Sequence, residues 1–125
     1  MATAREVMGG GFSAGQANAL GGQVASVTAA GSTQTDAATI TASINTVGSA
    51  DGTKGVILPT GAPGDEIWIF NNSGSTLKVY PPSGSAISVA GTGLGSANAA
   101  FSQLTYKCTV YKLVSSTQYF ALTTV

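Results

Sequence analysis

The sequence predicts an all-β fold, an antiparallel sandwich or barrel, and residues 55–87 carry most of the signal. Three short apolar runs in this stretch are each closed by glycine, proline, asparagine or aspartate residues that turn the chain (56–58, 67–70 and 77–80). Short strands with turn chemistry at this spacing are typical of antiparallel sandwiches and barrels. Similar segments along the rest of the chain bring the expected count to seven or eight strands.

The N-terminal region, residues 1–23, is rich in glycine and alanine and predicts an arm with a short capped helix. Ser13 and Gln16 have the spacing of a capping box, in which each side chain bonds a backbone N–H of the other. Gly21 and Gly22 would end this turn. Because so short a helix is ordered only by docking, two interpretations stay open: a frayed terminus, or an arm that lies on a neighbouring subunit.

Residues 24–125 are expected to form the β-sandwich domain, because alternating patterns begin at Val24. The segment 37–47 places apolar residues and Thr46 on one face (Ile40, Ala42, Ile44) and hydroxyl or amide side chains on the outward face (Thr39, Thr41, Ser43, Asn45). Towards the C-terminus, residues 103–114 and 118–124 predict a hairpin, in which Cys108 is a small buried side chain. We find no internal repeat, which argues against a solenoid.

The run 67–70 is apolar on both faces, which predicts a central strand with core on one side and a second layer or a partner on the other. The expected core consists of aliphatic residues from the three central runs (Ile57, Ile67, Ile69, Leu77 and Val79).

The residues that catalysis and metal binding need are scarce. The chain has no histidine and one cysteine, which excludes a Ser-His-Asp triad and the usual zinc sites. Asp65 and Glu66 are adjacent, but neighbours on a strand point to opposite faces. The glycine-rich residues 91–96 follow a short β segment but lead to another strand, so they lack the following helix of a phosphate-binding loop, and they lack its Lys-Ser or Lys-Thr pair. We therefore expect no enzymatic activity, no metal and no cofactor.

Charge is low and balanced. Five basic and five acidic residues give a net charge of zero, so nucleic acid is not an expected partner. Charged residues make up 8% of the chain, against about 25% in an average domain. This indicates a surface covered by partners; the alternative is a soluble domain that uses serine and threonine instead of charge. No apolar stretch approaches membrane-spanning length, so no membrane contact is expected.

The chain resembles a family of small bacteriophage virion proteins, on motifs from the N-terminal region, the central block and the C-terminal hairpin (12–17, 55–59, 62–65, 69–71, 77–84 and 117–119). Proteins of this kind are similar to head decoration (cement) proteins and to modules of tail fibres. The resemblance implies a jelly-roll-like dimer or trimer that stabilises the phage head by bridging major capsid proteins. No catalytic residues carry over from such a family.

The resulting expectation is a structural virion protein on the outer surface of the phage head, whose partners are the major capsid protein and further copies of itself. Contact with the capsid or a neighbouring subunit is expected from the N-terminal arm (Arg5, Val7, Met8, Phe12 and Leu20). The alternative is a tail-fibre or spike module that binds a receptor glycan. That alternative predicts an exposed cluster of Trp and Tyr rings on one face.

Overall fold

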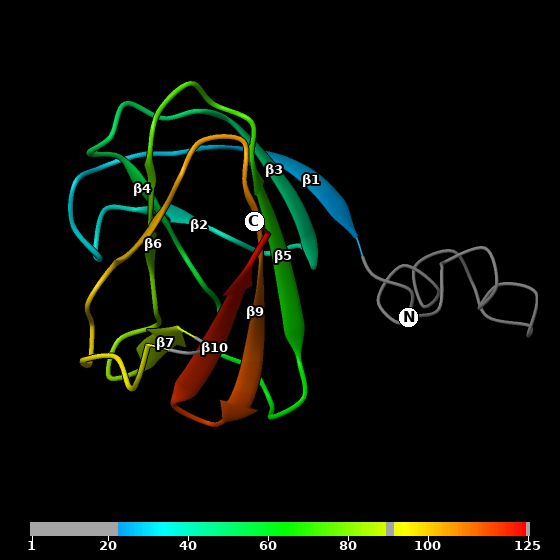
Figure 1. The fold of residues 1–125 in the computed structure, drawn as a ribbon, viewed down its shortest axis with the longest axis vertical. Coiled ribbons are helices and arrows are strands. Elements are labelled where there is room, and N and C mark those ends of the chain that lie inside the picture. Colours follow the sequence, from blue (N-terminus) through cyan, green and yellow to red (C-terminus); the bar gives the residue numbers. More distant parts are fainter. Residues whose placement is uncertain (1–22, 90–91, 125) are drawn as a thin grey trace, which may run out of the picture.

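The computed structural model describes residues 23–89 and 92–124, and these residues form an all-β, sandwich-like fold without a helix (Figure 1). One mixed sheet has six strands, in the order β1 (Val24–Thr28), β3 (Ile44–Ser49), β5 (Glu66–Asn71), β9 (Cys108–Ser115), β10 (Gln118–Thr123) and β7 (Ala86–Val89). The other has four, in the order β2 (Ala38–Thr39), β4 (Gly55–Ile57), β6 (Leu77–Tyr80) and β8 (Phe101–Gln103). The ten strands exceed the seven or eight expected, because β2 and β8 are too short to stand out in the sequence.

The chain alternates between the two sheets from β1 to β9, so consecutive strands rarely pair with each other. Each strand from β1 to β4 instead pairs with the strand two places along, which runs in the same direction. The expected antiparallel pairing is therefore wrong for five of the eight pairings between described strands. A jelly roll is an antiparallel fold, and that part of the expectation is not confirmed.

The turn signals were identified correctly, but several of them are corners and not hairpins. Residues 72–76 carry the chain from β5 in one sheet to β6 in the other. Local turn chemistry cannot distinguish a corner from a hairpin, because both need the same residues. The first six strands form a two-sheet coil of unequal turns: Val24 pairs with Ile44, 20 residues on, and Ile44 pairs with Trp68, 24 residues on. Unequal turns leave no fixed sequence period, which agrees with the lack of an internal repeat.

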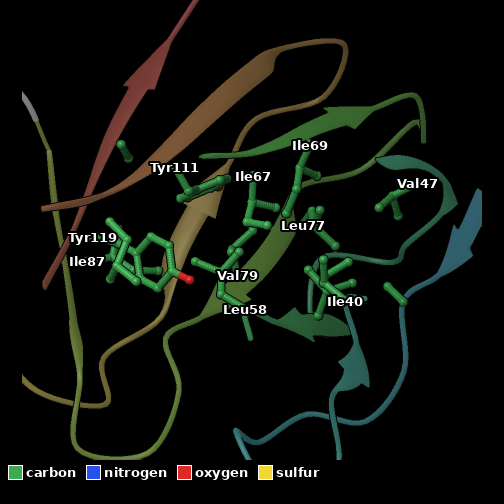
Figure 2. Packing of buried hydrophobic residues seen from close by; sticks show 14 residues of the cluster. Ile40, Val47, Leu58, Ile67, Ile69, Leu77, Val79, Ile87, Tyr111 and Tyr119 are labelled. Atoms are coloured by element: carbon green, nitrogen blue, oxygen red, sulfur yellow. The ribbon is translucent and has the colours of Figure 1, made fainter. Parts of the chain in front are cut away.

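The core lies between the two sheets and contains 14 buried apolar residues drawn from both (Figure 2). Four of the five expected core residues are buried there, namely Ile67, Ile69, Leu77 and Val79. Ile57 is the error. It is only half-buried, because Val56 and Leu58 on either side of it take the inward positions of the alternation.

The alternation over residues 37–47 predicts one continuous strand, and this prediction is wrong. The two ends of the segment belong to different sheets, and the chain crosses between them after Thr39. The crossing changes the phase of the alternation, so Ile44 points outward and Asn45 points inward. The buried Asn45 amide donates to the carbonyl oxygens of Ala42, at 2.8 Å, and Trp68, at 3.3 Å, which offsets part of the cost of burying it.

A buried polar cluster ties the short edge strand β8 to the six-stranded sheet. The Tyr111 hydroxyl donates to Gln103 Oε1 at 2.7 Å. Gln103 Nε2 in turn donates to the carbonyl oxygens of Ile69, at 2.8 Å, and Lys107, at 2.9 Å. Gln103 and Tyr111 are both fully buried, so these bonds form away from water, where breaking one is costly.

The C-terminal hairpin is confirmed, with β9 and β10 paired antiparallel. Its first residues differ from the prediction, since 101–103 form β8 in the other sheet and only the strand from Cys108 belongs to the hairpin. The expected capped helix, and the contact residues expected on the N-terminal arm, lie outside the described residues.

Candidate interaction surface

The outer face of the six-stranded sheet, which points away from the core, carries a row of five apolar side chains. Val24, Ile44, Trp68, Val110 and Leu122 are direct cross-strand neighbours on β1, β3, β5, β9 and β10. We call these five residues the apolar row. Val24 is 74% exposed, Trp68 37% and Leu122 65%. Apolar surface that is contiguous and solvent-exposed is typical of interaction sites.

The sequence of β5 explains the centre of this row. Its alternation places Ile67 and Ile69 in the core, and therefore places Trp68 and Phe70 on the outer face. The strand is central in its sheet, as expected from its apolar character on both faces. Its outer side chains are exposed in the single chain, so a covering partner on this side stays a prediction.

A shallow groove of about 350 Å³ runs beside Trp68 on this face, with a lining that is almost entirely apolar (Trp68, Cys108, Val110, Leu122, Thr123 and Thr124). Cys108 is thus half-buried on the outer face, and its expected place as a buried side chain is corrected. The reason is the phase of β9, which turns Thr109 and Tyr111 to the core. Partial burial raises the pKa of the Cys108 thiol, which disfavours the reactive thiolate.

One ion pair borders the apolar row. Lys112 Nζ lies 3.1 Å from Glu66 Oε1, and the two residues are cross-strand neighbours on β5 and β9, two residues along from the pair Trp68 and Val110. The Trp68 indole N–H donates to Glu66 Oε2 at 3.4 Å. The hydrogen bond from Lys112 is the main cause that lowers the pKa of Glu66. Both charges stay in contact with solvent, so the pair contributes little to stability but helps to orient the indole ring.

The acidic residues support turns. Asp65 Oδ2 accepts from the Ala62 backbone N–H at 2.9 Å, which confirms its expected role in the turn at 62–65. Asp36 and Asp51 also accept backbone N–H bonds within their own loops. Bonds from Thr33 and Thr53 are the main causes that lower the pKa of the Asp36 and Asp51 carboxyls. Within residues 23–89 and 92–124, no three His, Cys, Asp or Glu side chains gather as metal ligands would.

The rings that a sugar platform would need are divided between core and surface. Tyr111 and Tyr119 are buried, and burial raises the pKa of both, that of Tyr119 to about 12. Tyr119 donates to the Pro59 carbonyl at 2.6 Å, and Tyr80 donates to the Ser32 carbonyl at 3.1 Å. The aromatic rings on the outer face are instead those of Trp68, Phe70 and Phe120.

Sequence reasoning missed four members of the apolar row, all except Trp68. Each lies in an expected strand and is apolar, but no local signal brings them together, because the row depends on the register of five strands.

The part of the chain that the structure describes holds no helix with the length and hydropathy needed to cross a membrane. The chain matches no protein-family model, and it matches neither a curated protein nor a solved structure.

Proposed function

We propose that this chain is a structural bacteriophage protein, a capsid decoration protein on the outer surface of the head. The apolar row is the observation that supports this function best. A small domain with five apolar side chains aligned across one sheet, and with Trp68 at their centre, has a surface suited to a stable contact. The low content of charged residues favours the same interpretation.

The mechanism is added contact on an assembled lattice. A protein that binds the shell but not its separated subunits shifts the equilibrium towards the shell. The sandwich-like body acts as a rigid spacer, since its core and its buried polar cluster hold both sheets in fixed relation. No reacting group is required for this role.

In this proposal two surfaces of the protein make different contacts. The outer face holds subunits together, and the N-terminal arm, with Arg5, Val7, Met8, Phe12 and Leu20, contacts the capsid. This division allows the arm to be removed without disturbing the core, because, among residues 23–89 and 92–124, every member of the buried cluster lies at or beyond Ala29.

Binding to particles tests the proposal. Purified protein is titrated onto phage heads that lack it, and bound copies are counted against the major capsid protein. We expect saturation at a fixed ratio, and a markedly lower occupancy for the chain without residues 1–22, whose circular dichroism keeps the β signature. Absence of saturable binding by the full chain contradicts decoration, whereas equal occupancy of both chains contradicts only the role of the arm.

A second candidate, a tail-fibre module that binds a glycan, is favoured by the surroundings of Trp68. Its ring is partly exposed beside the Glu66–Lys112 pair, and an aromatic ring next to polar groups suits a sugar with one apolar and one polar side. Binding on a glycan array that is lost in Trp68→Ala would support this candidate. Negative-stain images of particles with and without the protein separate the two, since they place it on the head or on the tail.

A further inference from the structure

We propose that a second copy of this chain covers the apolar row, so that two six-stranded sheets pack face to face about a two-fold axis. This names the partner of the outer face, and it rests on the proposed function because it takes that face to be a contact surface. Three properties of the row favour this occupant: its order, its charge and its area.

The order of the row suits two-fold pairing. Trp68 is the third of five residues, with Val24 and Ile44 on one side and Val110 and Leu122 on the other. A two-fold axis parallel to β5 would therefore set Trp68 against its own copy at the centre and aliphatic residues against aliphatic residues on either side. An interface of this kind uses the same patch on both copies and must be self-complementary, and the row meets that requirement.

The charge of the face is compatible with its burial. No member of the apolar row is charged, and the adjacent Glu66 and Lys112 already neutralise each other at 3.1 Å. Two copies can thus approach without burying an unpaired charge, which would be the main obstacle to association. The groove beside Trp68 adds an apolar recess, lined by Val110 and Leu122, into which a side chain of the second copy can fit.

The area of the face is sufficient for a modest dimer. Five strands spaced about 4.8 Å apart, each with about six residues rising 3.3 Å, offer roughly 500 Å² per copy. Two facing copies would bury roughly 1,000 Å², which lies at the lower limit for a specific interface. We therefore expect association in the micromolar range, in the aligned packing of two sheets about 10 Å apart.

The competing occupant is the chain's own N-terminal segment. Residues 1–22 join the described chain at Gln23, beside the first residue of the apolar row. A segment attached so close has a high effective concentration at this face. The experiment must therefore separate pairing of two sheets from coverage by the segment.

Sedimentation of the full chain over about 1–100 μM tests the proposal, since micromolar dimers dissociate across this range. We expect a monomer–dimer equilibrium, and at least about a tenfold weaker association for Leu122→Lys, because the two-fold axis buries the new charge twice. Leu104→Lys is the matched control: Leu104 is 58% exposed, as Leu122 is 65% exposed, but it follows β8 in the other sheet. The control should associate as the unmodified chain does.

Two residues of the groove can report whether a second copy covers it, because Trp68 is the only tryptophan and Cys108 the only cysteine of the chain. As the protein concentration rises, the fluorescence emission of Trp68 should shift to the blue and labelling of the Cys108 thiol should slow. The chain without residues 1–22 should still dimerise. A monomer at every concentration, whose Trp68 emission shifts to the red on removal of residues 1–22, would show coverage by the segment and overturn the proposal.

Other outcomes are equally decisive. A trimer would overturn the two-fold arrangement, and equal association of Leu122→Lys and Leu104→Lys would overturn the choice of face. A dimer that fails to bind phage heads would contradict decoration and leave the pairing intact. Full occupancy of heads by monomeric Leu122→Lys would show that decoration does not require this dimer.

Discussion

The buried bond between Tyr111 and Gln103 allows the connection between β8 and the six-stranded sheet to be measured. Tyr111→Phe removes the hydroxyl that donates to Gln103 Oε1 at 2.7 Å and changes little else in volume. The glutamine oxygen is then left without that donor in a fully buried place. The cost of such an unpaired buried group is about 1–3 kcal/mol of unfolding free energy.

Gln103→Leu is the more severe change. It removes the acceptor of the Tyr111 hydroxyl and the donor to the carbonyl oxygens of Ile69 and Lys107. With three groups affected, we expect a loss of about 3 kcal/mol or more. Adding Tyr111→Phe to Gln103→Leu should cost little further, because it removes a hydroxyl that has already lost its partner. The loss of unfolding free energy in the double variant should therefore be about 1–2 kcal/mol smaller than the sum of the losses in the two single variants.

Urea denaturation at low protein concentration, where the monomer predominates, measures these differences. Trp68, the only tryptophan, reports unfolding through its emission. Tyr80→Phe is the control, because Tyr80 bonds the Ser32 carbonyl at 3.1 Å in a solvent-exposed place, and its loss should cost less than about 0.5 kcal/mol. Strict additivity of the two core changes, or equal losses for Tyr111→Phe and Tyr80→Phe, would refute the reasoning.

Three further perturbations test the fold. Gly55→Ala should destabilise the protein by about 1–3 kcal/mol in urea denaturation, because the new Cβ would lie 2.7 Å from the Lys78 carbonyl oxygen and 2.8 Å from Tyr80 Cε2. An unchanged urea midpoint would contradict the close approach of β4 and β6. Leu77→Ala should cost about 2–5 kcal/mol through the cavity it leaves, and a loss below 1 kcal/mol would argue against full burial. Burial raises the pKa of Tyr119 from 10.0 to about 12, so the unfolded chain releases its proton first and stability should fall between these pH values. The fall should be shallower in Tyr119→Phe, where Tyr111, whose pKa is also raised by burial, still contributes; equal slopes in the two chains would contradict the role of Tyr119.

The class of the fold and much of its core could be predicted from sequence, because local alternation determines which side chains share a face. Ile67, Ile69, Leu77 and Val79 are buried as expected, and the C-terminal hairpin lies where the turn at residues 115–117 suggested. The apolar character of residues 67–70 on both faces also predicted a central strand, and β5 is paired on both sides. These features depend on neighbours within a few residues of each other.

Strand pairing and the candidate site could not be predicted, because both depend on distant segments. The inward-facing positions shift by one residue between Ala42 and Asn45, because the chain crosses from one sheet to the other there, and no residue type in this segment indicates the crossing. The apolar row joins Val24 to Leu122 across almost the whole chain, and periodicity within a strand contains no information on its register against another. Residues of a docking surface also resemble core residues in sequence, since both are apolar.

The position of the C-terminal hairpin has a consequence for synthesis on the ribosome. Because β9 lies between β5 and β10, and β10 pairs with β7, the six-stranded sheet is incomplete until the last strand has emerged from the ribosome. Until β9 has emerged, β5 presents an unpaired edge with Trp68 and Phe70 beside it, a template for aggregation. Chains that end before Cys108 should therefore be insoluble, whereas a permuted chain that begins with β9 and β10 should acquire its central strands early and fold during translation.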